Sequence, residues 1–271
     1  MKRWILFVTA VSVFLTLEVN VIKASAATVS EFEVVSEPAK ERMAYKVGLG
    51  VAALPDYEGS EDYTIAPIPF ISIVGKSGMS AELLGNVLRV NVIPSNTWRF
   101  GPLLRYRVER DDVDNGQVDR MKDVDAAIEL GGYAGFDINN WSLKIDVAGD
   151  TSGTHNGIVG GISLGYTWLF NPWRLTLSGS STFADNKYMQ TYFGVDSVDS
   201  ARSGLSSYSP GGGIKDVGAA LIAGYKFNEN WGLTSALRYT LLVEDAADSP
   251  LVDGVGSESQ VLLGVLATYS F

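Results

Sequence analysis

The feature of this sequence that most limits its fold is a two-residue alternation of apolar side chains, which recurs in segment after segment from residue 43 onwards. In the last segment, 258–271, one face carries an apolar residue at every second position, namely Val261, Leu263, Val265, Ala267, Tyr269 and Phe271. A period of two is that of a strand with two unlike faces, whereas a helix repeats every 3.6 residues. The chain is therefore predicted to be all-β and antiparallel.

The strand rules divide the chain into about twelve such segments, and most have the length of about 9–11 residues with which a tilted strand crosses a bilayer. After the first 26 residues no stretch of 18 apolar residues occurs, so no transmembrane helix is expected. Strands that close into a barrel satisfy every backbone group where lipid offers no partner. The predicted strands of this transmembrane β-barrel are 43–54, 63–75, 78–83, 87–93, 98–110, 124–137, 141–150, 156–169, 172–183, 216–227, 231–243 and 258–271.

Short and long connections alternate in the second half of the chain. Very short turns occur at 139–140, 171–172 and 228–230, and three of the longer connections between them are 111–123, 184–215 and 244–257. This is the arrangement of an outer-membrane barrel with tight periplasmic turns and long outer loops. Four connecting segments, 55–62, 111–125, 184–215 and 244–257, hold 17 of the 31 acidic residues. Their expected role is solubility, or bridging by divalent cations to anionic lipopolysaccharide.

Aromatic residues gather beside the short turns. A belt of tryptophan and tyrosine is typical of a membrane interface. A soluble antiparallel β-sandwich, which would show the same alternation, has no reason to place its tryptophans at one end. The predicted periplasmic aromatic girdle consists of Trp98, Trp141, Trp168, Trp173, Trp231, Tyr269 and Phe271.

The charged residues within the strands fall on the face opposite the tryptophans. An ion in hydrocarbon costs several kcal/mol, so these side chains are predicted to line the lumen. Two interpretations remain open, a polar channel lining or ion pairs that fill a narrow barrel. The predicted lumen-lining residues are Arg89, Arg99, Arg105, Arg107, Glu129, Lys144, Asp146 and Arg238.

The N-terminus has the pattern of an exported protein. Lys2 and Arg3 precede an apolar run, and Ala24-Ser25-Ala26 is a small-residue cleavage site. The predicted division is a signal peptide over 1–26, a flexible periplasmic tail over 27–42 and the barrel over 43–271. The net charge of −10 argues against a nucleic-acid partner, and the absence of cysteine excludes disulfides and thiolate chemistry.

Catalytic signals are weak. The chain has one histidine, His155, in a predicted outer turn between Gly153 and Gly157. A hydrolase at the rim would need a nucleophile, a base and an orienting group, and no nucleophile motif accompanies this histidine. No cysteine cluster or histidine pair suggests zinc. No catalytic, cofactor-binding or metal-binding residue is therefore predicted, and a hydrolase using His155 is the weakest of the functional hypotheses.

Several motifs along the chain are similar to those of the MipA/OmpV family. They are Tyr45-Lys46-Val47-Gly48-Leu49-Gly50, Pro55-Asp56-Tyr57-Glu58-Gly59-Ser60, Pro67-Ile68-Pro69, Tyr192-Phe193-Gly194-Val195, Ala201-Arg202-Ser203-Gly204-Leu205, Tyr208-Ser209-Pro210 and Asp248-Ser249-Pro250-Leu251-Val252. The resemblance implies a Gram-negative outer-membrane barrel without catalytic residues or cofactors. It further implies a scaffold for a lytic murein transglycosylase and a murein synthase, while other members resemble porins, so a diffusion channel for small polar solutes is the alternative. The last strand, with Tyr269 and Phe271, is expected to engage the barrel-assembly machinery.

Overall fold

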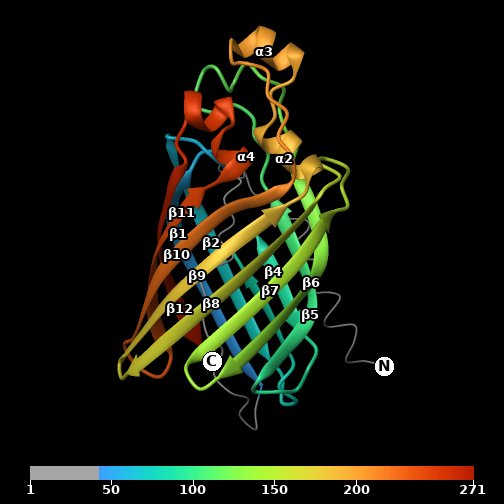
Figure 1. Cartoon of the computed structure of the whole chain (residues 1–271). Coiled ribbons are helices and arrows are strands. Elements are labelled where there is room, and N and C mark those ends of the chain that lie inside the picture. The colour runs from blue at the N-terminus through green and yellow to red at the C-terminus, as the bar shows by residue number, and fades with distance from the viewer. Residues whose placement is uncertain (1–42) are drawn as a thin grey trace, which may run out of the picture.

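Each strand pairs with its neighbours in sequence, and the first strand closes on the last. The structure, a computed structural model, describes residues 43–271 as a closed barrel of twelve antiparallel strands (Figure 1). The predicted fold class and strand number are confirmed, whereas the predicted signal peptide and tail, 1–26 and 27–42, lie outside the described residues. The strands are β1 (Ala44–Pro55), β2 (Tyr63–Val74), β3 (Ser80–Leu84), β4 (Val87–Asn91), β5 (Trp98–Arg107), β6 (Ala127–Ile138), β7 (Trp141–Asp150), β8 (Ile158–Phe170), β9 (Trp173–Ala184), β10 (Gly213–Lys226), β11 (Trp231–Leu242) and β12 (Ser259–Ser270).

The alternation in the sequence becomes an inside and an outside of the barrel wall. On β1, Leu49 and Val51 are 68% and 56% exposed, whereas their neighbours Ala52 and Leu54 are buried. The register from Lys46 opposite Ser270 to Ala53 opposite Leu263 closes β1 on β12. The apolar face therefore points outward, as a bilayer requires and as a soluble sandwich does not allow.

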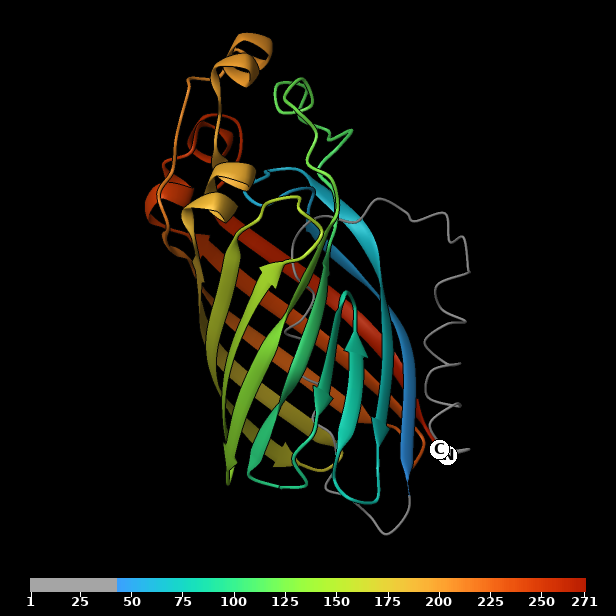
Figure 2. The same ribbon diagram turned by 90° about the vertical axis from the view of Figure 1, so that its right-hand side faces the viewer.

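The two ends of the barrel differ. Figures 1 and 2 show short turns and the C-terminus at one end and all the labelled helices at the other. The long connections, predicted only as loops, contain α2 (Asn186–Phe193), α3 (Ser197–Ser203), α4 (Glu244–Ala247) and η1 (Pro250–Gly254). α2 and α3 begin after Asp185 and Asp196, whose carboxylates accept N–H bonds of the first turn. Among residues 43–271 no helix is long and apolar enough to cross a membrane.

The hairpin of β3 and β4 is unusually short and rises only part of the way up the wall (Figure 2). β2 pairs with β3 from Val74 only as far as Phe70. The next carbonyl, of Pro69, accepts a bond from the turn residue Gly85. Pro67 lies two residues before Pro69 on β2. Because alternate residues of a strand point the same way, its backbone faces the same edge of β2, beyond the end of β3. Neither proline has an N–H to leave unpaired, which explains their place beside the missing partner.

An apolar layer lines one part of the lumen wall. Its buried side chains come from β10, β11, β12, β1, β2 and β3, which are consecutive in the closed barrel. Side chains that pack together in this way exclude solvent from that part of the wall. The layer comprises Ala52, Leu54, Ala66, Ile68, Phe70, Leu84, Ile222, Ala236, Leu262 and Leu266.

Candidate functional site

A buried ion network fills one side of the lumen toward the helical end. Arg107 donates through Nε to Glu129 Oε1 at 2.8 Å, and Arg105 donates to the other oxygen of Glu129 at 3.0 Å. Arg105 also reaches Asp146 on β7 at 2.8 Å. Glu129 faces its two arginines because β5 and β6 are neighbours, with Arg105 opposite Glu129 in the register. Arginine can bind two carboxylates at once, because its planar guanidinium group carries five N–H donors.

The network continues into the connection between β1 and β2 through Glu58. Its Oε1 accepts from Arg107 at 3.1 Å, and its Oε2 lies 3.4 Å from Lys215 Nζ. The Tyr188 hydroxyl donates to the same carboxylate at 3.0 Å. Lys215 in turn binds Asp216 at 2.6 Å. Glu58 thus joins an outer loop, the helix α2 and the barrel wall.

A β-bulge explains how Lys215 enters this network. In a regular strand Lys215 and Asp216 would point to opposite faces. The register between β9 and β10 shifts between Ile214 and Asp216. Both side chains are consequently buried inside the barrel. Bulges redirect side chains in this way, and the alternation of the sequence contains no sign of this one.

His155 lies under the outer turn rather than on its surface. Its side chain is fully buried, and its Nδ1 accepts the N–H of Gly157 at 3.1 Å. Its Nε2 lies 3.3 Å from Glu129 Oε1 without completing a hydrogen bond of good geometry. The nearby Ser152 hydroxyl donates to Asp150 and not to the imidazole. The arrangement lacks the serine-to-histidine contact of a nucleophilic hydrolase.

Two tyrosines of α2 cover the network from above. The guanidinium of Arg107 lies 4.8 Å from the ring centre of Tyr188 and 5.4 Å from that of Tyr192, which is the geometry of a cation–π contact. Burial raises the pKa of Tyr188 and of Tyr192 far above the ordinary tyrosine range, although the nearby Arg107 opposes this. Both hydroxyls are therefore neutral at physiological pH.

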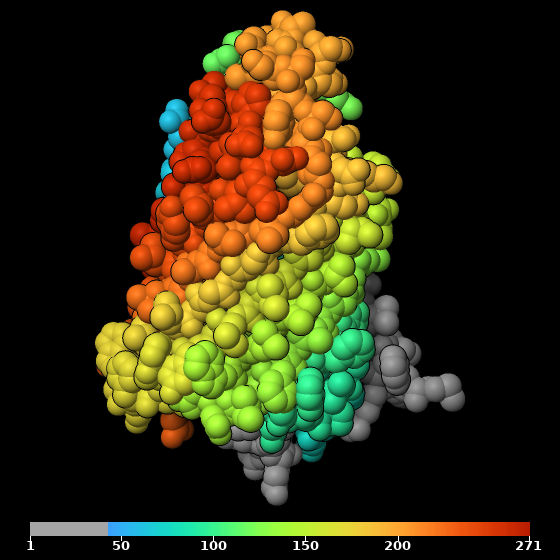
Figure 3. Space-filling model, in the orientation of Figure 1, coloured from blue at the N-terminus to red at the C-terminus, as the bar shows by residue number. Residues whose placement is uncertain are grey.

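The outer loops form a packed cap over the barrel mouth. One apolar cluster joins α2, α4 and η1 to the ends of the strands through Tyr188, Phe193, Leu242 and Val252. Higher up, a second cluster contains Tyr57 together with residues of three other loops. The space-filling view shows the orange and red loop segments packed directly against one another above the strands (Figure 3). Packed side chains of the outer loops thus lie over the helical end of the barrel.

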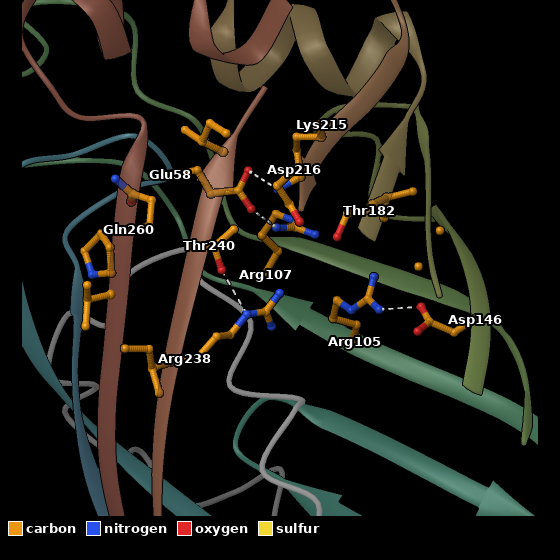
Figure 4. Close-up of a pocket in the computed structure, with 17 residues that line it drawn as sticks. Glu58, Arg105, Arg107, Asp146, Thr182, Lys215, Asp216, Arg238, Thr240 and Gln260 are labelled. Atoms are coloured by element: carbon orange, nitrogen blue, oxygen red, sulfur yellow. Dashed lines mark hydrogen bonds and ion pairs between the residues drawn. The ribbon is translucent and has the colours of Figure 1, made fainter. Parts of the chain in front are cut away.

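The described part of the chain contains small cavities, two of which lie near the charged lumen residues. The upper one, of about 100 Å³, lies within the ion network and is bordered by Arg105, Asp216 and Arg238 (Figure 4). The lower one, of about 40 Å³, is bordered by Arg89 and Lys144. Asp146 borders both cavities. The ion pair of Asp146 with Arg105 therefore lies where the two cavities come together.

The residues that were predicted to line the lumen lie at different levels along it. Arg105, Arg107, Asp146 and Arg238 border the upper cavity, and Arg89, Lys144 and again Asp146 border the lower one. Glu129 is buried behind the upper cavity. Arg99 lies nearer the short turns and binds Asp137 at 2.7 Å. Reasoning from the sequence missed Glu58, Lys215, Tyr188 and Tyr192, which belong to loops or to the bulge.

The residues expected in the girdle lie at the short-turn end of their strands, where the tryptophans are 41–56% exposed. They contact neighbouring aromatic rings edge-on or tilted. Trp98 contacts Phe136 at 4.6 Å, and Trp231 contacts Tyr269 at 4.9 Å. Tyr269 in turn contacts Phe271 at 4.9 Å.

Within 43–271 no group of His, Cys, Asp and Glu side chains could hold a metal ion.

Comparison with known proteins agrees with this architecture. Residues 47–271 match the family model described as MltA-interacting protein MipA. The MltA-interacting protein of Escherichia coli (strain K12) is 28% identical over 213 residues, covering 77% of this chain and 84% of that protein. The putative outer membrane protein YiaT of Escherichia coli O157:H7 is 30% identical over 205 residues, with coverages of 73% and 79%. OmpV of Vibrio cholerae is 24% identical over 196 residues, with 72% of each chain covered.

Among solved structures, an outer membrane channel from Pseudomonas putida F1 aligns with a TM-score of 0.49 and 11% identity, covering 90% of this chain and 100% of that one. The sequence relatives named as outer membrane proteins, YiaT and OmpV, place this chain in the outer membrane of a Gram-negative bacterium.

Proposed function

The chain belongs to the MltA-interacting protein MipA family, and from this premise we propose that it is a non-enzymatic barrel that docks a murein-remodelling enzyme at the outer membrane. One structural observation supports the proposal: side chains occupy much of the lumen. The outer loops pack into a cap, a buried ion network lies near it, and an apolar layer lines part of the wall. A barrel whose interior is occupied in this way is better suited to present a surface than to pass solutes.

The partner class comes from the family. One relative is named as interacting with MltA, and a lytic murein transglycosylase is the partner that the family resemblance implies. Short turns of outer-membrane barrels face the periplasm, where murein lies. The docking surface would therefore be the short-turn end, which includes the exposed Asn139, Asn171 and Glu229.

Binding to a lytic transglycosylase tests the proposal. The full barrel is refolded into nanodiscs and titrated with the purified enzyme by surface plasmon resonance, with Glu229→Lys as a charge reversal at the short-turn end. Asp253→Lys at the helical end is the matched control, because both carboxylates are exposed. We expect saturable binding that Glu229→Lys weakens several-fold and Asp253→Lys leaves unchanged. A chain lacking residues 27–42 shows whether that segment contributes. Absence of binding by the unaltered barrel would disprove the docking role.

A diffusion channel for small polar solutes is the second candidate, and the two cavities in series favour it. Asp146, which pairs with Arg105, borders both cavities. A gated channel predicts current steps in planar bilayers that become more frequent in Asp146→Ala. Continued silence of both the parent barrel and this variant would rule the channel out.

A hydrolase using His155 has little geometric support. Its imidazole is buried against Glu129, Tyr188 and Tyr192, and the nearby serine hydroxyl points to Asp150. Turnover of a lipid or ester substrate by the purified barrel, abolished by His155→Ala, is the result that would revive this hypothesis.

A further inference from the structure

The upper cavity is surrounded by ionised side chains, and the number of cations among them equals the number of anions. Four cations, Arg105, Arg107, Lys215 and Arg238, are matched by Glu58, Glu129, Asp146 and Asp216 in the cavity wall or directly behind it. Bringing a net charge into such a buried site is costly because no counter-charge remains for it. An occupant of this cavity should therefore carry no net charge.

Two buried atoms of the cavity wall nevertheless complete no hydrogen bond of good geometry within the protein. One is Nε of Arg105, a donor, and the other is Oδ1 of Asp216, an acceptor, although the Thr182 hydroxyl lies close to the Asp216 carboxylate. Both side chains are more than nine-tenths buried. A buried polar atom without a partner is unfavourable, and such an atom requires an explanation such as a water or a ligand.

The donor and the acceptor come from different parts of the wall. Arg105 belongs to β5 and Asp216 to β10, and these strands are not neighbours in the barrel. In the view of Figure 4 the side chains of Asp216 and Arg105 lie apart, with Arg107 between them. A molecule that satisfies both atoms must carry an acceptor at one end and a donor at the other.

The size of the cavity limits such a molecule. About 100 Å³ of internal space, at about 10–15 Å³ for each enclosed water, has room for several waters or for one small molecule. Glycine and alanine are among the smallest molecules that carry both an acceptor and a donor. Both combine a carboxylate, which suits Arg105, with an ammonium group, which suits Asp216, and both have zero net charge.

From the balanced charge, the two unpartnered atoms and the volume, we propose that the upper cavity is a binding site for a small zwitterion of the α-amino-acid class. The carboxylate accepts from Arg105 Nε and the ammonium group donates to Asp216 Oδ1. Thr182, Thr240 and Gln260, which also border the cavity, supply further polar contacts. This site is independent of the docking role, since it lies under the outer cap and not at the short turns.

Equilibrium dialysis of the refolded full chain against labelled glycine at millimolar concentrations tests the site. Acetate, methylammonium and ethylene glycol serve as competitors that carry only the anion, only the cation or no charge. We expect one saturable glycine site per barrel, displaced by alanine and at least tenfold less readily by the three partial analogues. No saturable binding would mean that the cavity holds water only, and equal displacement by any of the three partial analogues would refute the zwitterion class.

Two substitutions on the same strand provide a matched pair. Gly161 borders the upper cavity and Gly165 the lower one. A Cβ at either position would meet its nearest neighbour at 3.6 Å or 3.5 Å, an ordinary contact, so neither position excludes a side chain at its Cβ. Thermal unfolding of both valine variants confirms that they fold. Gly161→Val is expected to reduce glycine binding at least tenfold, whereas Gly165→Val should leave it unchanged. Equal effects of the two variants, or no effect of Gly161→Val, would overturn the assignment.

Discussion

Arg107 and Glu129 form a deeply buried ion pair, with an Nε to Oε1 distance of 2.8 Å and side chains that are 2% and 0% exposed. Arg105 binds the other carboxylate oxygen. A charge in this position is stable only while its partner is present, because removal of one partner leaves the other buried and uncompensated. This relationship makes the carboxylate of Glu129 the point at which the lumen is most sensitive to substitution.

Glu129→Gln is expected to destabilise the barrel by about 3–5 kcal/mol, since two buried guanidinium groups lose their shared counter-ion. Asp137→Asn is the matched control, because the pair of Asp137 with Arg99 is about 30% exposed and should be worth no more than about 1 kcal/mol. Urea unfolding in detergent micelles, followed by tryptophan fluorescence, measures both. Similar losses in the two variants would show that burial of the Glu129 pair does not matter.

The cap provides a second prediction. Phe193 is the last residue of α2 and is fully buried in the apolar cluster that joins α2, α4 and η1 in the cap. Phe193→Ala removes this contact, with a cost of about 3–5 kcal/mol for a buried phenylalanine. The outer loops should then open more often, which faster amide hydrogen exchange in 186–203 and 244–254 would reveal.

Phe183→Ala on β9 is the control for the cap, because this ring is 52% exposed on the outer face of the barrel. It should leave exchange in the loops unchanged. If Phe193→Ala also leaves it unchanged, the cap is held by the Glu58 contacts and not by its apolar cluster.

The sequence was sufficient for the barrel and for part of the lumen. Alternation fixes which residues share a face, so Arg105, Arg107 and Asp146 could be assigned to one side of the wall. It could not show that Lys215 points inward, because a bulge changes the parity at that point. Nor could it place Glu58 and Tyr188, since both lie in connections whose folding depends on contacts between distant parts of the chain. Whether the lumen is open or filled depends on those same contacts.

The outward face of the strands is predicted to lie in lipid. Leu177, near the middle of β9, is 49% exposed, and Leu177→Arg should destabilise the barrel in bilayers by about 2–4 kcal/mol. Val198→Arg is the matched control, since Val198 is 52% exposed but belongs to α3 in the outer cap, where arginine remains in water. Folding titrations in phosphatidylcholine vesicles measure the difference. Equal stabilities of the two variants would be incompatible with a membrane-facing Leu177.

Alkaline pH should open the cap through Tyr57, which is buried in the connection between β1 and β2. Burial raises the pKa of Tyr57 to about 12, against a smaller opposing effect of the nearby Ser60 hydroxyl, which completes no hydrogen bond of good geometry with it. The folded-state pKa is thus above the unfolded value of about 10. The stability contributed by neutral Tyr57 is fully present below pH 10 and is lost as the pH rises through 12.

Tyr57→Phe removes this titration and also a buried hydroxyl without a partner, so it should cost less than about 1 kcal/mol at neutral pH or even stabilise the cap. The alkaline opening of the outer loops, followed by limited proteolysis with an alkaline-stable protease, should then move to higher pH. Tyr106→Phe in the barrel wall is the control, because Tyr106 is 39% exposed on the outer face and belongs to β5, not to the cap. An unchanged opening pH in Tyr57→Phe would assign the alkaline transition to Tyr188 and Tyr192, whose pKa values are also raised by burial under the same cap.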